Sequence, residues 1–84
     1  MTQEEATRDI AQAGVHLSNA RALMMGIRSG TPTDSVAHKL AQQRVYDIYT
    51  VNTQVWYLGA MIEQYGLAET NPPESVILLS RNLT

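Results

Sequence analysis

Residues 48–62 read IYTVNTQVWYLGAMI and contain no charged side chain. Every aromatic residue of the chain lies within this stretch or within three positions of its ends. A helix that is apolar around most of its circumference has to be covered on more than one side. The rest of an 84-residue chain offers little material for that cover. The stretch therefore predicts self-association or docking on another protein.

Composition and charge disfavour several classes of protein. The chain has no cysteine, which removes disulfides and thiolate metal sites. Its net charge is −2 and its six basic residues are scattered, so it lacks the basic patch that nucleic acids require. As a helix the uncharged stretch would cover about 22 Å, less than a bilayer core of roughly 30 Å, and no membrane span is expected. The acidic, polar start at Met1–Glu5 is unlike a signal peptide, and we expect a cytoplasmic protein.

The length predicts one domain, residues 1–84, and the pattern predicts an all-α fold. A first helix is expected over about 3–29, because Thr2 and Glu5 have the spacing of a capping box. It should end at Gly30 in a left-handed conformation. Gly14 and Gly26 are interpreted as relieving crowding inside it. Its apolar residues recur at steps of four and three and form one seam: Ala6, Ile10, Ala13, Leu17, Ala20, Met24 and Ile27.

A second helix is expected over about 32–65, with Thr31 as its N-cap, Pro32 in its first turn and Gly66 after its end. So short a connection makes the two helices an antiparallel hairpin. The expected register places Ala13 near Ile48. The face that packs on the first seam comprises Ala37, Ala41, Val45, Ile48, Asn52, Val55, Gly59 and Ile62.

Two further rows of the second helix lie outside this contact. The aliphatic row comprises Val36, Leu40, Val51 and Leu58, and the aromatic row comprises Tyr46, Tyr49, Thr53, Trp56 and Ala60. A lone hairpin would leave both rows in water, an apolar surface larger than soluble monomers usually expose. One candidate cover is a C-terminal segment over about 72–82, either a short helix or a strand. The other is a second copy of the chain. We expect both covers, and hence a homo-oligomeric helical bundle.

A β-strand interpretation of Val45–Leu58 competes with the helix, since β-branched and aromatic residues are common there. Strict alternation fails, however, because Asp47 interrupts one face and Asn52 with Gln54 interrupts the other. Helix is therefore favoured.

No residues assemble into a recognisable catalytic, cofactor or metal site. His16 and His38 are the candidate metal ligands or general bases, but the expected register separates them by about 12 Å along the axis. No carboxylate completes a ligand set around either histidine. No phosphate-binding glycine loop or nucleophile elbow occurs. We therefore expect neither an enzyme nor a cofactor.

Two interpretations are open for Asn52, and two for the aromatic residues of the candidate interface. Asn52 is either a device that fixes register or oligomeric state, or an amide at the edge of the seam that reaches water. The aromatic residues are either core and self-interface, or a hot spot for a foreign partner. The complete set is Tyr46, Tyr49, Asn52, Thr53, Trp56, Tyr57, Val36, Leu40, Val51 and Leu58.

These features favour a non-enzymatic, self-associating helical module for protein–protein interaction. Such a protein would act as a structural component, adaptor or inhibitor in a larger assembly, and an origin in a phage or accessory element is compatible with it. The alternative is a small dimeric transcriptional regulator, in which the break at Gly30 precedes a recognition helix. Residues 32–43 weigh against that alternative, since Lys39 and His38 are their only candidate cations.

Overall fold

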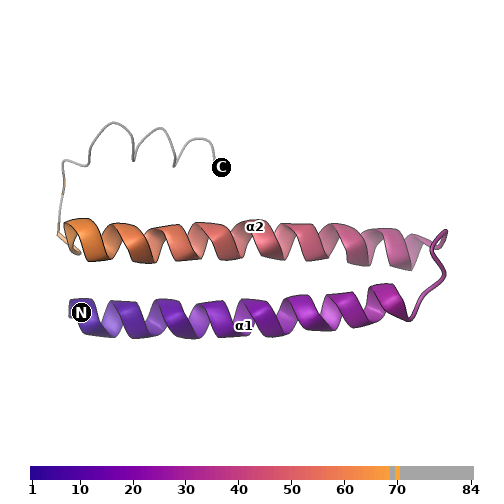
Figure 1. The fold of residues 1–84 in the computed structure, drawn as a ribbon, viewed down its shortest axis with the longest axis horizontal. Helices are drawn as coiled ribbons and strands as arrows, with labels where there is room; N and C mark the ends of the chain where they lie inside the picture. Colours follow the sequence, from indigo (N-terminus) through magenta and orange to yellow (C-terminus); the bar gives the residue numbers. More distant parts are fainter. Residues whose placement is uncertain (69, 71–84) are drawn as a thin grey trace.

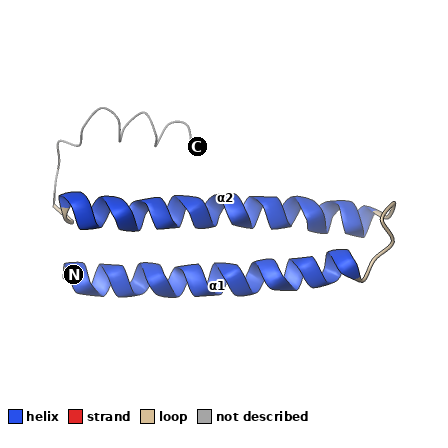
Figure 2. Cartoon of the chain, viewed as in Figure 1, coloured by secondary structure: helices blue, strands red, loops and turns tan. Residues whose placement is uncertain are grey.

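The computed structural model describes residues 1–68 and 70, and within them the fold is a helical hairpin. Helix α1 spans Gln3–Ser29 and helix α2 spans Val36–Tyr65. They run antiparallel, side by side, so that the N-terminus lies next to the C-terminal end of α2 (Figure 1). The described residues contain no strand, and Val45–Leu58 is helical throughout (Figure 2). The predicted segment at about 72–82 lies outside the described residues.

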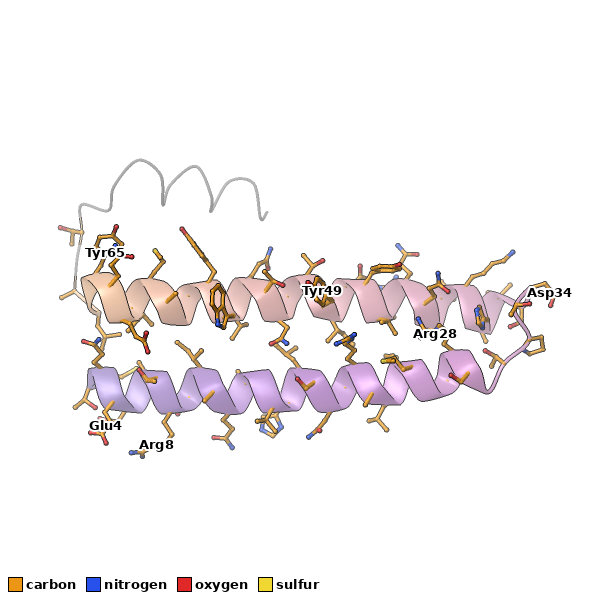
Figure 3. The ribbon with its side chains drawn as sticks, viewed as in Figure 1. Glu4, Arg8, Arg28, Asp34, Tyr49 and Tyr65 are labelled. Carbon is orange, nitrogen blue, oxygen red and sulfur yellow. The ribbon has the colours of Figure 1, made fainter. Side chains whose placement is uncertain are left out.

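Helix α1 begins at the capping box that its sequence indicates. The Thr2 hydroxyl accepts a hydrogen bond from the Glu5 backbone N–H at 3.1 Å, and a Glu5 carboxylate oxygen accepts from the Thr2 N–H, also at 3.1 Å. Two backbone donors at the helix start are thereby satisfied reciprocally. Glu4 and Arg8 form a loose ion pair at 4.0 Å, and both project from α1 on the side away from α2 (Figure 3).

The end of α1 differs from its prediction. Gly30 has φ −89° and ψ 3°, outside the left-handed region expected for it. The last turn closes instead through the Gly30 N–H, which donates to the Gly26 carbonyl at 3.0 Å. The Thr31 hydroxyl also donates to the Ile27 carbonyl at 2.8 Å. Thr31 therefore finishes the first helix, and the prediction that it caps the second was wrong.

Helix α2 begins at Val36, four residues later than the predicted start at Pro32. Ser35 is its N-cap: its hydroxyl accepts from the His38 backbone N–H at 3.1 Å. Residues 32–35 form a turn instead, in which the Ser35 N–H donates to the Pro32 carbonyl at 3.0 Å. At the other end Gly66, with φ 81°, follows the helix as predicted, because a glycine takes this backbone conformation without strain.

The longer connection changes the register of the hairpin by about one helical turn. Gly14 faces Asn52, since a Cβ at Gly14 would lie 3.8 Å from the Asn52 side-chain oxygen. Ala13 had been expected near Ile48, which lies a turn earlier in α2. Gly26 faces open space among the described residues, so the interpretation that it relieves crowding was wrong.

The core lies between the two helices and is thin. Ala6, Ala41 and Val45 are the buried apolar residues among those described. Most other positions of the two predicted faces are half-buried, as expected for a hairpin with one contact surface. Ile27 and Ala37 are exceptions, and both are exposed because each lies beside the turn, where the opposite helix ends.

Candidate interaction surface

One hydrogen bond links α1 to α2 at each end of the hairpin. At the open end the Gln3 side-chain amide donates to the Ile62 carbonyl at 3.1 Å. At the turn the His38 Nδ1 donates to the Arg28 carbonyl at 2.7 Å. A carbonyl oxygen can only accept, so Nδ1 carries the proton. His38 is therefore a structural residue that joins α2 to the last turn of α1, whereas His16 is exposed.

The aromatic row remains in water along most of α2. Trp56 is 71% exposed, Tyr46 64% and Tyr49 59%. Thr53 is also exposed, and Ala60 is half-buried. More than half of the surface of one tryptophan and two tyrosines on one row is in water, which is unusual because aromatic side chains contribute most when they are buried. The row is therefore the leading candidate for a contact surface.

Small residues on the adjacent side of α1 leave a groove beside this row. The groove measures about 270 Å³ and lies between the two helices. Its lining comprises Thr7, Ile10, Ala11, Trp56, Gly59, Ala60 and Glu63. This volume falls just below the range usual for small-molecule sites, so the groove suits a single inserted side chain better than a ligand. Glu63 is the one ionisable residue of this lining.

An open depression of about 450 Å³ lies at the turn end of the aromatic row. It is lined by polar side chains around Tyr46, among them Lys39 and Gln42. Tyr46 and Trp56 therefore each lie beside a hollow, on the same helix and about 2.8 turns apart.

Tyr49 is the member of the aromatic row that α1 holds in place. The Arg21 guanidinium carbon lies 5.8 Å from the centre of the Tyr49 ring, within range of a cation–π contact. At an exposed site such a contact contributes about 0.5–1 kcal/mol. It orients the ring from the α1 side and leaves its outer edge free, at the middle of α2 (Figure 3).

The aliphatic row is also exposed, but it is interrupted. Val36, Leu40, Val51 and Leu58 are all exposed, with Val36 the most so at 72%. Between Leu40 and Val51, Arg44 pairs with Asp47 on the same helix at 3.2 Å. This ion pair divides the aliphatic row into two apolar parts. The aliphatic row is therefore a weaker contact surface than the aromatic row.

Two candidate residues lie apart from these rows. Asn52 is half-buried and faces Gly14, so its side chain belongs to the contact between α1 and α2. Tyr57 is half-buried, and its hydroxyl is buried without a hydrogen bond to any described residue.

The aromatic row extends further than its apolar members suggest. Lys39 and Gln42 precede Tyr46, and Glu63 follows Ala60, at the same alternating steps of three and four. All three are exposed. The resulting extended row comprises Lys39, Gln42, Tyr46, Tyr49, Thr53, Trp56, Ala60 and Glu63. Lys39, Gln42 and Glu63 were not among the predicted interface residues, because the predicted row ended at its last apolar or aromatic member on each side, although the heptad spacing continues through them.

The described residues hold no metal cluster and no membrane-spanning helix, and the chain resembles no known family. Among the described residues, no three histidines or carboxylates come close enough together to hold a metal ion. Neither described helix combines the length and apolar character needed to cross a membrane. No protein-family model, curated protein or solved structure matches the chain.

Proposed function

We propose that this protein is a non-enzymatic helical module for protein–protein interaction that self-associates and serves as a structural component, adaptor or inhibitor in a larger assembly. The observation that carries the proposal is the exposure of the aromatic row, with Trp56 71% accessible. Tryptophan and tyrosine are enriched in protein interfaces and dominate their binding energy. Such side chains gain most when a partner removes them from water.

The thin core supports the same proposal. A hairpin with three buried apolar residues has little to offset its conformational entropy, and small domains are marginally stable. Anything that binds the folded chain and not the unfolded chain adds stability by mass action. Association through the outer rows of α2 would therefore both use the exposed surface and stabilise the fold.

The alternative of a helix-turn-helix regulator has less support. Helices of that motif meet at about 90–120°, whereas α1 and α2 lie side by side over their length (Figure 1). The first half of α2 also provides few cations for a phosphate backbone. A salt-dependent shift of DNA in a gel would revive this alternative.

Sedimentation of the full chain at several micromolar concentrations tests the proposal. We expect a dimer or larger species, and a melting temperature that rises with protein concentration. A monomer throughout the series, with helicity intact by circular dichroism, would contradict self-association.

A pull-down from the native host with wild-type and Trp56→Ala bait then tests for a foreign partner, whose capture should depend on Trp56.

A further inference from the structure

We propose that the extended row contacts the same row of a second copy, running antiparallel to it around a twofold axis. This inference rests on the proposed self-association and specifies its surface and register. The extended row spans about 6.7 helical turns at heptad spacing, which is the pattern of a helix seam that packs against another helix. A twofold axis places one surface patch against itself, so the row has to be complementary to its own reverse.

The order of residues along the row meets that condition. With the axis midway between Tyr49 and Thr53, row members at equal distance from the axis face each other across the interface. This places Lys39 opposite Glu63 and Tyr46 opposite Trp56. It also places Gln42 opposite Ala60, and Tyr49 opposite Thr53. Because the axis is twofold, each of these contacts occurs twice in the dimer.

Each facing pair is chemically matched. Lys39 and Glu63 carry opposite charges at the two ends of the row, where complementary charge fixes register. Tyr46 and Trp56 form an aromatic pair. In the two remaining pairs a longer side chain meets a shorter one, which allows close packing.

The hollows beside the row fit this arrangement. Tyr46 of the second copy faces Trp56 and lies next to the groove of about 270 Å³ between α1 and α2. Trp56 of the second copy faces Tyr46 and the depression beside it. A fully buried aromatic side chain removes about 150–250 Å² from water, and these three are already about one-third buried. They can therefore supply about half of the roughly 800 Å² that each partner buries in a stable interface.

The aliphatic row is the competing surface. It could also pair with its own reverse, placing Leu40 opposite Val51 and Arg44 opposite Asp47. Arg44 and Asp47 already pair within one helix at 3.2 Å, however, so a second copy adds little to their electrostatic energy. The aliphatic row has no aromatic residue and would bury less area.

Charge reversal tests the register of the proposed dimer. Lys39→Glu and Glu63→Lys each place like charges together twice, and each should weaken the dimer about tenfold at low salt. Mixing the two variants should restore association, because the mixed dimer regains two opposite-charge pairs. The double variant K39E/E63K should behave like the wild type. The register would be overturned if either single variant dimerised as tightly as the wild type. It would also be overturned if the mixture dimerised no more tightly than each variant does alone.

Cysteine cross-linking tests the choice of surface, since the chain has no cysteine of its own. In Q42C/A60C the two positions lie about 27 Å apart on one helix, so a disulfide can form only between copies. We expect rapid covalent dimerisation of Q42C/A60C on mild oxidation and little for the control L40C/V51C. Cross-linking of the control alone would overturn this inference and leave self-association standing. A dimer that cross-links through neither pair would also overturn it, whereas a chain that is monomeric throughout contradicts the proposed function as well.

Discussion

Ile10 of α1 packs directly on Gly59 of α2: a Cβ at position 59 would lie 3.2 Å from Ile10 Cγ2. This is closer than ordinary van der Waals contact, so the missing side chain is what lets Ile10 reach the α2 backbone. A glycine inside a helix costs about 1 kcal/mol relative to alanine. The tight contact with Ile10 is the compensating gain.

The first prediction compares alanine at two glycines. Gly26→Ala should stabilise the chain by about 0.5–1 kcal/mol, because the position is helical and faces open space among the described residues. Gly59→Ala should gain clearly less, since Ile10 has to move, and Gly59→Leu should lose about 1–3 kcal/mol. Urea unfolding followed by circular dichroism measures all three. Equal gains for Gly26→Ala and Gly59→Ala would mean that Ile10 does not pack on Gly59.

The second prediction concerns overpacking of the thin core. Ala41 is 5% exposed, so Ala41→Leu forces extra methylenes between the helices and should destabilise by about 1–3 kcal/mol. Ala22→Leu is the matched control, because Ala22 is exposed on α1 and a larger side chain there can extend into water. Thermal melts of both variants at one concentration separate the two. A similar melting temperature for both would indicate that the contact between α1 and α2 is looser than described.

The all-helical fold could be predicted from sequence because its signals are local. The capping box at Thr2 and Glu5 and the positive-φ glycine at 66 each act within a few residues of the chain. The periodicity of the sequence also predicts the face of each helix that packs on the other. Every residue of these two faces except Ile27 and Ala37 is at least half-buried. The exposure of Tyr46 and Trp56 outside these faces follows from the same periodicity.

The register could not be predicted, because it depends on a choice between two adjacent caps. Thr31 and Ser35 each precede a sequence that can start a helix. In the observed structure α2 begins after Ser35, and this start is accompanied by the hydrogen bond from His38 to the Arg28 carbonyl. Local propensity carries no information about that bond. The tight contact at Gly59 was missed for the same reason, since it exists only in the observed register.

The third prediction tests the bond that fixes the turn. His38→Ala removes the donor at 2.7 Å from the Arg28 carbonyl and should cost about 0.5–1.5 kcal/mol relative to His16→Ala. His16→Ala is the control because it makes the same change in helix propensity at an exposed position. His38→Asn keeps a donor near the position of Nδ1 and should recover part of the loss. Urea unfolding provides the comparison, and identical stability of the two alanine variants would contradict a role for His38 in the turn.

The last prediction separates the hairpin core from the contact surface. Trp56 is 71% exposed, so Trp56→Ala should change the stability of the isolated hairpin far less than the 3–5 kcal/mol usual for a buried tryptophan. We expect it to weaken self-association by more than about 2 kcal/mol. The melting temperature of the variant should therefore lose its dependence on protein concentration, while the melting temperature at the lowest concentration stays close to that of the wild type.

The control for this prediction is Leu58→Ala, two residues away on the aliphatic row and 52% exposed. It should leave the concentration dependence of melting intact, because Leu58 lies outside the extended row.

Fluorescence gives an independent measurement, since Trp56 is the sole tryptophan of the chain. On dilution of the wild type, emission should shift to longer wavelength as the indole returns to water, and Leu58→Ala should follow the same curve. If Leu58→Ala abolishes the shift and Trp56→Ala preserves the concentration-dependent melting, the aliphatic row is the contact surface and the assignment to the aromatic row is wrong.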